Sequence, residues 1–396
     1  MPSAFPSALL GSGRPLTIRG AGHSCDGQTV TDGELLVTYA PKSAAPQVRE
    51  VGDGLVEVPV GMSWYGLERY LNRRGRSFPV LPNYLHMSVG GTLSVGGIGI
   101  DSVRRGMQVD HVDRIQLIDG TGTSRWCSRV DHPELFRFAL AGLGTVGLIE
   151  RAVLHTVPYQ RETHLHRTNH ASLAELAEHT EEIARRGDAD IYWAMLRRGR
   201  ISSVVGWRGS DSRCDTEDCA VVSDLTFARH PDTGQSSRNS DRVRMWADYV
   251  VPAGQLAPML ERVEAMTRKS PLAHVPTMLY SLIVRRGTGS TSFAFSPAGT
   301  APVSIGVGVY TSPDRDSAAI VAVRRVFREL LQLCCELGGR PYLYGVADLD
   351  GSLADSLYGP ELDRLAHLRS AHHLEHLNAH LPLVQAAAGR PADRAR

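Results

Sequence analysis

A histidine at the tip of a glycine-rich run is the first residue that could do chemistry. It is His23, within residues 19–24 (RGAGHS), and Gln28 follows shortly after. Residues 16–18 read as the end of a buried strand, and the two glycines then allow a tight turn whose N–H groups could bind an anion such as a pyrophosphate. The imidazole would face whatever this first glycine segment binds. Alone, the run fits a glycine-rich hairpin turn equally well.

A second glycine segment occupies residues 82–99. It contains two Gly-Gly pairs within eight residues, separated by Thr and Ser hydroxyls. A packed strand would not accept so many glycines, because glycine buries no side chain and costs ordering entropy. Val89, Leu93, Val95 and Ile98 argue against a flexible, exposed loop. We therefore expect a stretch of backbone that approaches a flat, polar ligand closely.

A third glycine segment covers residues 139–149. It resembles a dinucleotide-binding fingerprint, but a predicted helix precedes it and a predicted strand follows it. A Rossmann turn has the opposite order, strand before helix. The segment therefore argues against a nicotinamide-dependent dehydrogenase.

Composition places the chain among globular proteins. Its 396 residues suffice for two domains, and 43 Lys and Arg balance 42 Asp and Glu. This balance indicates no nucleic-acid or membrane partner, and no apolar run approaches the roughly 18 residues that cross a bilayer. No secretory signal is recognisable at the N-terminus, and the six cysteines show no metal-ligand spacing. Cys214 and Cys219 could close a small loop, but we favour free thiols in a cytoplasmic protein.

The first part of the chain, residues 1–157, alternates short strands with glycine-rich turns. Its predicted elements are strands at 35–38, 55–60 and 113–118, a helix at 63–74, an Asp-Gly hairpin at 118–122, a helix at 133–141 and a strand at 148–156.

From about residue 158 the pattern changes to strands covered by amphipathic helices. The predicted helices are 171–186, 255–269 and 312–337, the predicted strands are 190–196, 201–207, 220–227, 278–284, 292–295 and 303–310, and 230–241 is predicted to be a loop. This pattern predicts a second α+β unit built on an antiparallel sheet.

The C-terminal part contains residues 340–345 and a predicted helix at 360–380. That helix carries His372, His373, His376 and His380, two of which would share a face. A metal site would need a further ligand from another segment, and none can be named. A solvated helix face is the favoured interpretation, and we expect no metal.

The three glycine segments, in this order and at these intervals, resemble the vanillyl-alcohol-oxidase-type (PCMH-type) family of FAD-binding oxidoreductases. Within that family the likeness is greatest to cytokinin dehydrogenase and its bacterial relatives. The first segment looks like the pyrophosphate loop, and the second and third look like further flavin-contacting segments. Residues 340–344 and Leu377-Asn378 resemble the C-terminal flavin contacts more loosely.

The resemblance implies an α+β fold: a two-subdomain PCMH-type FAD-binding module and an α+β substrate (cap) domain with an antiparallel sheet. It also implies the following FAD contacts in this chain: Ile18, Gly20, Ala21, Gly22, His23, Ser24, Gln28, Ser88, Gly91, Thr92, Ser94, Ile98, Ile149, Tyr342 and Asn378. The implied domains are FAD-binding over 1–157, substrate-binding over 158–339, and a segment over 340–396 that returns to the FAD domain.

In relatives with this loop, the histidine that matches His23 is bonded to the flavin 8α-methyl carbon. The resemblance therefore implies covalent FAD through His23, with a raised flavin potential and no loss of cofactor. A second link through cysteine occurs in some relatives, but no matching cysteine lies near residues 84–98. We expect a single covalent link.

Two features depart from the family pattern. The acid/base position before the Tyr-Leu of the second segment is Asn83, which can orient a substrate but cannot accept a proton at neutral pH. Either Asn83 is merely structural, or a base comes from elsewhere; His86, Asp101, Asp248 and His274 are candidates. Only 18 residues precede the loop, so either the start is assigned too far downstream or the first sheet lacks a piece.

Three functions remain open. The first is an FAD-dependent oxidase or dehydrogenase that takes hydride from a C–N or C–O bond of a small molecule and passes electrons to oxygen or another acceptor. The second is a sugar or alditol oxidase of the same flavin fold. The third is a degenerate, non-catalytic flavin-fold protein. We favour them in this order.

Overall fold

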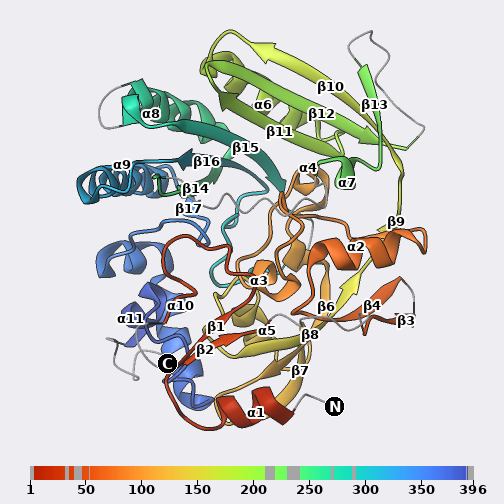
Figure 1. The fold of residues 1–396 in the computed structure, drawn as a ribbon, viewed down its shortest axis with the longest axis vertical. Coiled ribbons are helices and arrows are strands. Elements are labelled where there is room, and N and C mark those ends of the chain that lie inside the picture. Colours follow the sequence, from red (N-terminus) through yellow and green to blue (C-terminus); the bar gives the residue numbers. More distant parts are fainter. Residues whose placement is uncertain are drawn as a thin grey trace.

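The computed structural model describes residues 4–31, 35–39, 47–52, 54–209, 219–229, 241–268, 272–287, 291–388 and 390. The loop predicted at 230–241 lies outside these ranges except for its last residue. The chain mixes helices with mainly antiparallel sheets, as predicted (Figure 1). None of the described helices is long and apolar enough to cross a membrane.

The N-terminal part is built on a five-stranded antiparallel sheet. Its strand order is β3-β4-β8-β6-β7, with bounds Arg49–Gly52, Leu55–Pro59, Leu148–His155, Val112–Ile118 and Ser124–Ser128. Helices α2 (Trp64–Asn72) and α5 (Pro133–Ala139) belong to the same part. The Asp-Gly hairpin is confirmed: β6 and β7 pair in antiparallel register from Ile118 and Ser124 onward.

The strand that leads into the first glycine segment is β1 (Leu16–Arg19), preceded by α1 (Ala4–Leu10). It pairs in parallel with β2 (Leu35–Thr38) in a two-stranded sheet, and Leu16 forms an isolated bridge with Leu377. A further two-stranded sheet joins β5 (Arg76–Ser77) to β9 (Val157–Pro158).

The second glycine segment contains a short helix, α3 (Val89–Leu93). Two more short helices follow, α4 (Ser102–Arg105) and η1 (Gln108–His111). Val89 and Leu93 are fully buried, as their apolar character predicted.

The second unit is an eight-stranded sheet in the order β13-β10-β12-β11-β15-β16-β14-β17, and all its pairs are antiparallel. The bounds are Cys219–Ser223, Glu162–His170, Arg200–Arg208, Ile191–Arg197, Thr277–Arg285, Val303–Thr311, Met245–Pro252 and Arg340–Pro341. Helices α6 (Leu173–Arg186), α8 (Leu256–Arg268) and α9 (Ser317–Glu336) lie along one face of it (Figure 1).

Strand β14 shows how the two faces of this sheet differ. Ala247, Tyr249 and Val251 pack into the core formed with the helices, and the Tyr249 hydroxyl donates to the Phe327 carbonyl of α9 at 2.8 Å. Trp246 and Asp248 point to the opposite face, because side chains alternate along a strand. That opposite face looks toward the glycine segments.

Several predicted elements in the second unit were wrong or shifted. Residues 292–295 are irregular and end in a turn instead of forming a strand, and 220–227 divides into the end of β13 and a short helix, α7 (Leu225–Arg229). Helix α9 starts after Asp316, whose side chain accepts from the Ala318 N–H, rather than at residue 312. Strands β10 and β14 and the short helices η2 (Ala253–Gln255) and η3 (Leu272–His274) were not predicted.

The C-terminal helix was also misplaced. Helix α10 covers Gly351–Ala371, with Pro360 in its interior, and a short helix α11 covers Pro382–Ala388. The histidines therefore follow α10 instead of sharing one of its faces. His376 contacts the Leu10 carbonyl at 2.9 Å, and His380 contacts the Gln28 carbonyl at 3.3 Å. The described residues include no group of three or more His, Cys, Asp or Glu side chains that could hold a metal ion.

The expectation of free thiols is wrong for Cys219, which is disulfide-bonded. Among the described residues, Cys25, Cys127, Cys334 and Cys335 are free.

Candidate functional site

A cavity of about 770 Å³ lies between the glycine segments and the eight-stranded sheet. This volume falls within the usual range for ligand sites. The cavity is lined by every residue that the resemblance assigned to FAD, and by Asn83: Ile18, Gly20, Ala21, Gly22, His23, Ser24, Gln28, Ser88, Gly91, Thr92, Ser94, Ile98, Ile149, Tyr342 and Asn378. Residues separated by up to 360 positions thus face one space.

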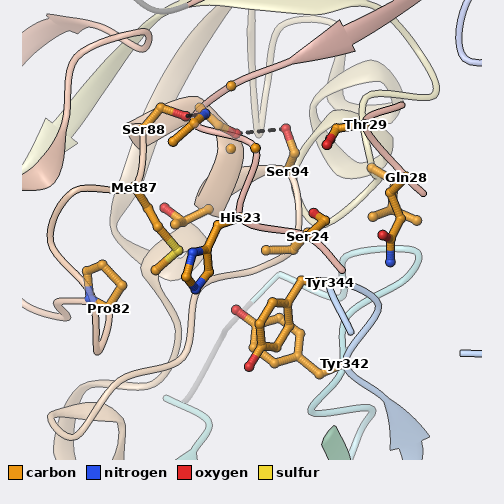
Figure 2. Close-up of a pocket in the computed structure, with 18 of the residues that line it drawn as sticks. His23, Ser24, Gln28, Thr29, Pro82, Met87, Ser88, Ser94, Tyr342 and Tyr344 are labelled. Atoms are coloured by element: carbon orange, nitrogen blue, oxygen red, sulfur yellow. Dashed lines mark hydrogen bonds between the residues drawn. The ribbon is translucent and has the colours of Figure 1, made fainter. Parts of the chain in front are cut away.

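The first and second glycine segments touch at Gly20 and Ser88. The Ala21 N–H donates to Ser88 Oγ at 3.3 Å (Figure 2). A Cβ on Gly20 would lie only 2.3 Å from that same oxygen. The glycine is therefore required for the backbone to approach the serine, and not only for a turn.

The third glycine segment is hydrogen-bonded to the second through its backbone. Ala141 N–H donates to the Leu93 carbonyl at 2.8 Å, and Leu143 N–H donates to the Ser94 carbonyl at 2.7 Å. Both donors have positive φ, 58° and 55°, a region that non-glycine residues seldom occupy. Such local strain persists only where surrounding contacts fix the backbone, and it concentrates at binding sites.

The C-terminal segment connects the first and third glycine segments through Asn378. Its Oδ1 accepts from the Ile18 N–H at 2.9 Å, and its Nδ2 donates to the Gly144 carbonyl at 2.9 Å. Asn378 itself has a φ of 48°, which asparagine tolerates better than most residues. One side chain therefore holds two cavity-lining segments at fixed spacing.

Three further hydrogen bonds attach the segment after β17 to the site. Gln28 Nε2 donates to the carbonyls of Leu343 and Gly345, at 3.1 and 2.8 Å. The Tyr342 hydroxyl accepts from the Ile98 N–H at 3.2 Å, which links this segment to the second glycine segment. Gln28 thus positions the backbone that carries Tyr342 and Tyr344.

His23 stands at the boundary between the glycine segments and the sheet. Its ring stacks on Tyr84 with centroids 5.2 Å apart and lies 5.6 Å from the ring of Trp246. Figure 2 shows the imidazole pointing into the cavity, on the side of Tyr342 and Tyr344. Burial lowers the pKa of His23, and the nearby Arg244 charge lowers it further. A neutral imidazole with an available nitrogen lone pair results, which is the nucleophilic form.

The sheet side of the cavity presents an acid among tyrosines. Asp248 on β14 is partly buried, and the Tyr310 hydroxyl donates to its Oδ1 at 3.3 Å. The Tyr344 hydroxyl lies 2.9 Å from the Tyr310 hydroxyl, on the same side of the cavity. Burial raises the pKa of Asp248 to about 6, although the neighbouring tyrosine hydroxyls act to lower it.

The other candidate bases do not line the cavity. His86 lies behind it, with its ring stacked on Tyr65 at 5.0 Å. Asp101 is paired with Arg208, whose Nε lies 3.1 Å from its Oδ1, and His274 is exposed in η3. Of the four candidates, only Asp248 is placed to meet a ligand.

The donors and acceptors in the cavity fit FAD, a flat ligand with polar edges and a diphosphate. Glycine backbone and the His23 ring offer close approach on one side. On the other, Trp246 Nε1 and Asp248 Oδ2 are buried and have no hydrogen-bond partner among the described residues. Buried polar atoms normally find partners, and both of these belong to residues that line the cavity.

Most of the cavity-lining residues that come from the eight-stranded sheet were not predicted from the sequence. Arg244, Trp246, Asp248 and Val250 all line the cavity, and they alternate along the chain as one face of a strand must. This alternation is readable in the sequence and would have identified both β14 and its ligand face. Tyr280 and Tyr310 come from β15 and β16, and no local pattern marks them.

Comparison with known proteins agrees with this geometry. Residues 8–128 match the model of an FAD binding domain. An uncharacterised oxidoreductase encoded by ORF5 of the fasciation locus of Rhodococcoides fascians is 34% identical over 158 residues, 40% of this chain and 35% of that protein. Cytokinin dehydrogenase 4 of Oryza sativa subsp. japonica is 31% identical over 208 residues, 51% of this chain and 39% of its own.

Cytokinin dehydrogenase 1 of the same plant is 32% identical over 236 residues, 57% of this chain and 44% of its own. The chain thus spans less than half the length of these curated relatives. The FAD domain match covers the first and second glycine segments, which the structure places on one cavity. The chain therefore contains an FAD binding domain and is related to the FAD-binding oxidoreductases that include the cytokinin dehydrogenases.

Proposed function

We propose that this protein is an FAD-dependent oxidoreductase that removes hydride from a C–N or C–O bond of a small molecule. Oxygen or another acceptor would then take the electrons. One observation carries the proposal: three glycine segments and an acid-bearing strand face each other across a single cavity of ligand size. The cytokinin dehydrogenase relatives favour a C–N bond, and the first proposed substrate class is therefore an amine.

In this proposal, the glycine segments hold FAD in the manner of a two-subdomain PCMH-type module. The N–H groups of residues 19–24 bind its pyrophosphate, and the second and third glycine segments contact the rest. Residues 1–157 would be the FAD domain, 158–339 the substrate domain, and 340–396 the returning segment. The contacts of Asn378 and Gln28 support the last assignment, because both join the C-terminal segment to the first glycine segment.

His23 would form a covalent bond to the cofactor. Support comes from its lowered pKa, which leaves the ring neutral, and from its place at the end of the first glycine segment inside the cavity. A nitrogen that carries no proton can attack an electron-poor carbon. FAD, when bound, supplies the hydride acceptor. The chain's own residues would exclude water, orient the substrate between the sheet and the glycine segments, and accept a proton.

Acid precipitation of purified protein tests the cofactor and its attachment separately. Yellow colour in the native protein that remains in the acid pellet supports covalent FAD. Colour that moves to the supernatant would exclude the covalent bond but would still support bound FAD. Protein that is colourless and stays so with added FAD would contradict the whole proposal and favour a degenerate, non-catalytic fold.

Two variants assign the attachment. His23→Ala should release its colour to the supernatant, because the proposed bond is gone. His86→Ala is the matched control, since His86 is near the site but does not line the cavity. Its colour should stay in the pellet. Retention of colour by His23→Ala would exclude His23 as the attachment point.

Substrate class is tested by anaerobic mixing with a secondary-amine cytokinin and with an alditol. Loss of flavin absorbance with the cytokinin alone supports amine oxidation. Loss with the alditol alone, with peroxide release in air, would instead favour the sugar or alditol oxidase function.

A further inference from the structure

We propose that Asp248 on β14 is the proton acceptor of this site, in place of a carboxylate at position 83. The inference rests on the proposed function, because it assigns a role within the same reaction. The substrate would be a small molecule whose C–N or C–O heteroatom carries a hydrogen. Asp248 would take that proton from the sheet side of the cavity.

Asn83, at the position of the family's acid/base residue, makes a hydrogen bond to Tyr280. The Asn83 amide oxygen accepts a hydrogen bond from the Tyr280 hydroxyl at 3.4 Å. An amide has no basic lone pair that binds a proton at neutral pH. Asn83 therefore positions Tyr280 across the cavity, and proton transfer has to use another group.

The geometry around Asp248 leaves one oxygen available. Oδ1 accepts from Tyr310, whereas Oδ2 is buried and has no hydrogen-bond partner among the described residues. A buried carboxylate oxygen without a partner is costly, and here it belongs to a residue that lines the ligand cavity. A substrate N–H or O–H would satisfy it.

The neighbouring strand is shaped to admit this carboxylate. Gly308 of β16 lies directly opposite Asp248 in the sheet register. A Cβ at Gly308 would lie 2.4 Å from Asp248 Oδ1 and 2.6 Å from the Tyr310 ring. Only glycine at this position leaves the acid and the tyrosine room to meet.

The proton affinity of Asp248 suits a base at neutral pH. Its pKa is raised to about 6 by burial, so the carboxylate is mostly ionised at pH 7 yet binds a proton more readily than an exposed aspartate. The titratable groups around it are Tyr249 on β14, Tyr310 on β16, Tyr344 and Tyr342 after β17, and the Cys25 thiol. Burial raises the pKa of each of them, so they stay neutral at pH 7.

The proposed step balances. The substrate C–H bond breaks and its hydrogen leaves with both electrons to the oxidised cofactor. The heteroatom–hydrogen bond breaks and the proton goes to Asp248 Oδ2, while the freed electron pair forms the C=N or C=O bond. Release of the product lets Asp248 return its proton to water, and oxygen or another acceptor reoxidises the cofactor. A tertiary amine lacks the required N–H and should not be oxidised by this route.

The first test needs no substrate. The visible spectrum of the yellow holoprotein is recorded from pH 4.5 to 8.5 for the wild type, Asp248→Asn and Asp110→Asn. A charge beside the flavin should change its absorbance with a midpoint near pH 6 in the wild type, and Asp248→Asn should lose this change. Asp110→Asn is the matched control. Asp110 is a partly buried aspartate whose pKa is also raised by desolvation, but it does not line the cavity.

The second test uses the cytokinin or alditol that bleaches the wild type. Asp248→Asn should slow anaerobic flavin reduction about 100-fold or more, the usual size of a general-base effect. Tyr310→Phe removes a hydrogen bond that lowers the pKa of Asp248, so the acid limb of its pH–rate and spectral profiles should move to higher pH. If Asp248→Asn loses its flavin, the Tyr310→Phe variant still tests the proposal.

The inference is overturned if the wild type shows no spectral change near pH 6, if Asp248→Asn keeps that change, or if Tyr310→Phe leaves the profile in place. Unchanged flavin reduction by Asp248→Asn would also overturn it. None of these results would harm the proposed function, because the protein would still be yellow. A colourless wild type would instead contradict the proposed function itself.

Discussion

At the scale of single residues, the site depends on contacts that leave no room for one more carbon. Gly20 is one of them, in the first glycine segment. A Cβ there would meet Ser88 Oγ at 2.3 Å, whereas the next atoms, Ser88 Cβ and Gly91 Cα, lie at 3.5 and 3.6 Å. The conflict is therefore with one oxygen atom, and it can be relieved by a single second substitution.

Gly20→Ala should lower flavin content and destabilise the protein by about 1–3 kcal/mol, the usual cost of overpacking. Ser88→Ala added to it should recover much of both, because the clashing Oγ is removed. Thermal unfolding and the flavin-to-protein absorbance ratio are the measurements. Gly66→Ala in α2 is the control, since its Cβ would have no neighbour closer than 3.5 Å. Equal loss in the single and double variants would contradict this reading.

Glu68 gives a residue-scale prediction about pH. It is fully buried, and burial raises its pKa to about 7, although Phe78 N–H and Ser77 Oγ donate to it at 2.8 and 2.9 Å. Between its usual pKa and this value, the native state binds more protons than the unfolded state. The free energy of unfolding should therefore fall as pH rises from about 4.5 to about 7.

The contribution of Glu68 to this fall should reach about 3 kcal/mol, at 1.36 kcal/mol for each pKa unit. Glu68→Gln keeps an acceptor oxygen but cannot ionise, so it should flatten the profile. Urea unfolding of the wild type and Glu68→Gln at pH 5, 6, 7 and 8 measures the difference. Exposed Glu50→Gln serves as the control and should leave the slope unchanged. Parallel profiles for wild type and Glu68→Gln would refute the assignment.

At the scale of elements, helix α10 supports the third glycine segment and the turn before Asn378 through one buried arginine, Arg369. Arg369 donates to the carbonyl of Thr145 in the third glycine segment at 2.6 Å. It also donates to the carbonyls of Leu374 and Leu377, at 2.6 and 2.9 Å, in the turn that leads to Asn378. Burial lowers the pKa of Arg369 to about 10, so it remains charged at pH 7.

Arg369→Met should therefore cost about 2–4 kcal/mol, because several buried carbonyls lose their donor. Flavin retention should fall as well, since the third glycine segment and Asn378 lose a common support. Arg364→Met on the same helix is the matched control. Its partner is Glu134 in a largely exposed ion pair, so the expected cost is at most about 1 kcal/mol. Equal effects of the two substitutions on flavin content would show that α10 does not act through Arg369.

At the scale of the whole molecule, the cavity is where the two α+β units meet. Its lining comes from the glycine segments on one side and from β14, β15 and β16 on the other. Cys25 Sγ also donates to the Trp246 carbonyl at 3.5 Å, and Asp26 pairs with Arg324 of α9. A ligand in this cavity contacts both units, so binding should stabilise the entire native state.

His23→Ala, stripped of its flavin, should unfold at a lower temperature than the native protein and recover as FAD is added. Ligand at 100 times its dissociation constant should add about 2.7 kcal/mol. Differential scanning calorimetry over a series of FAD concentrations checks this. ADP-ribose, which lacks the flavin ring, is the control ligand and should give a smaller shift. An unfolding temperature that does not change with FAD concentration would show that the cavity does not bind FAD.

Much of the fold was predictable because local pattern determines it. The hairpin at 118–122 and helix 171–186 were found through turn and capping residues, and Ser172 indeed caps α6 by accepting from the Glu175 N–H. Boundaries failed where caps were misjudged, as at Asp316, or where a proline sits inside a helix, as at Pro360. Strand β14 was missed although its alternation is visible.

The sequence by itself determined the cofactor side of the site. Its glycine segments need backbone freedom and close approach of the backbone to a neighbour, and glycines such as Gly20 indicate this requirement locally. Only the tertiary structure decided what lies opposite. Asp248, Tyr310 and Tyr344 come from separate strands and segments, and their meeting depends on cross-strand register and on the space left by Gly308. Nor does the sequence show that Oδ2 of Asp248 is buried without a hydrogen-bond partner, because burial and proton affinity arise from packing between distant segments.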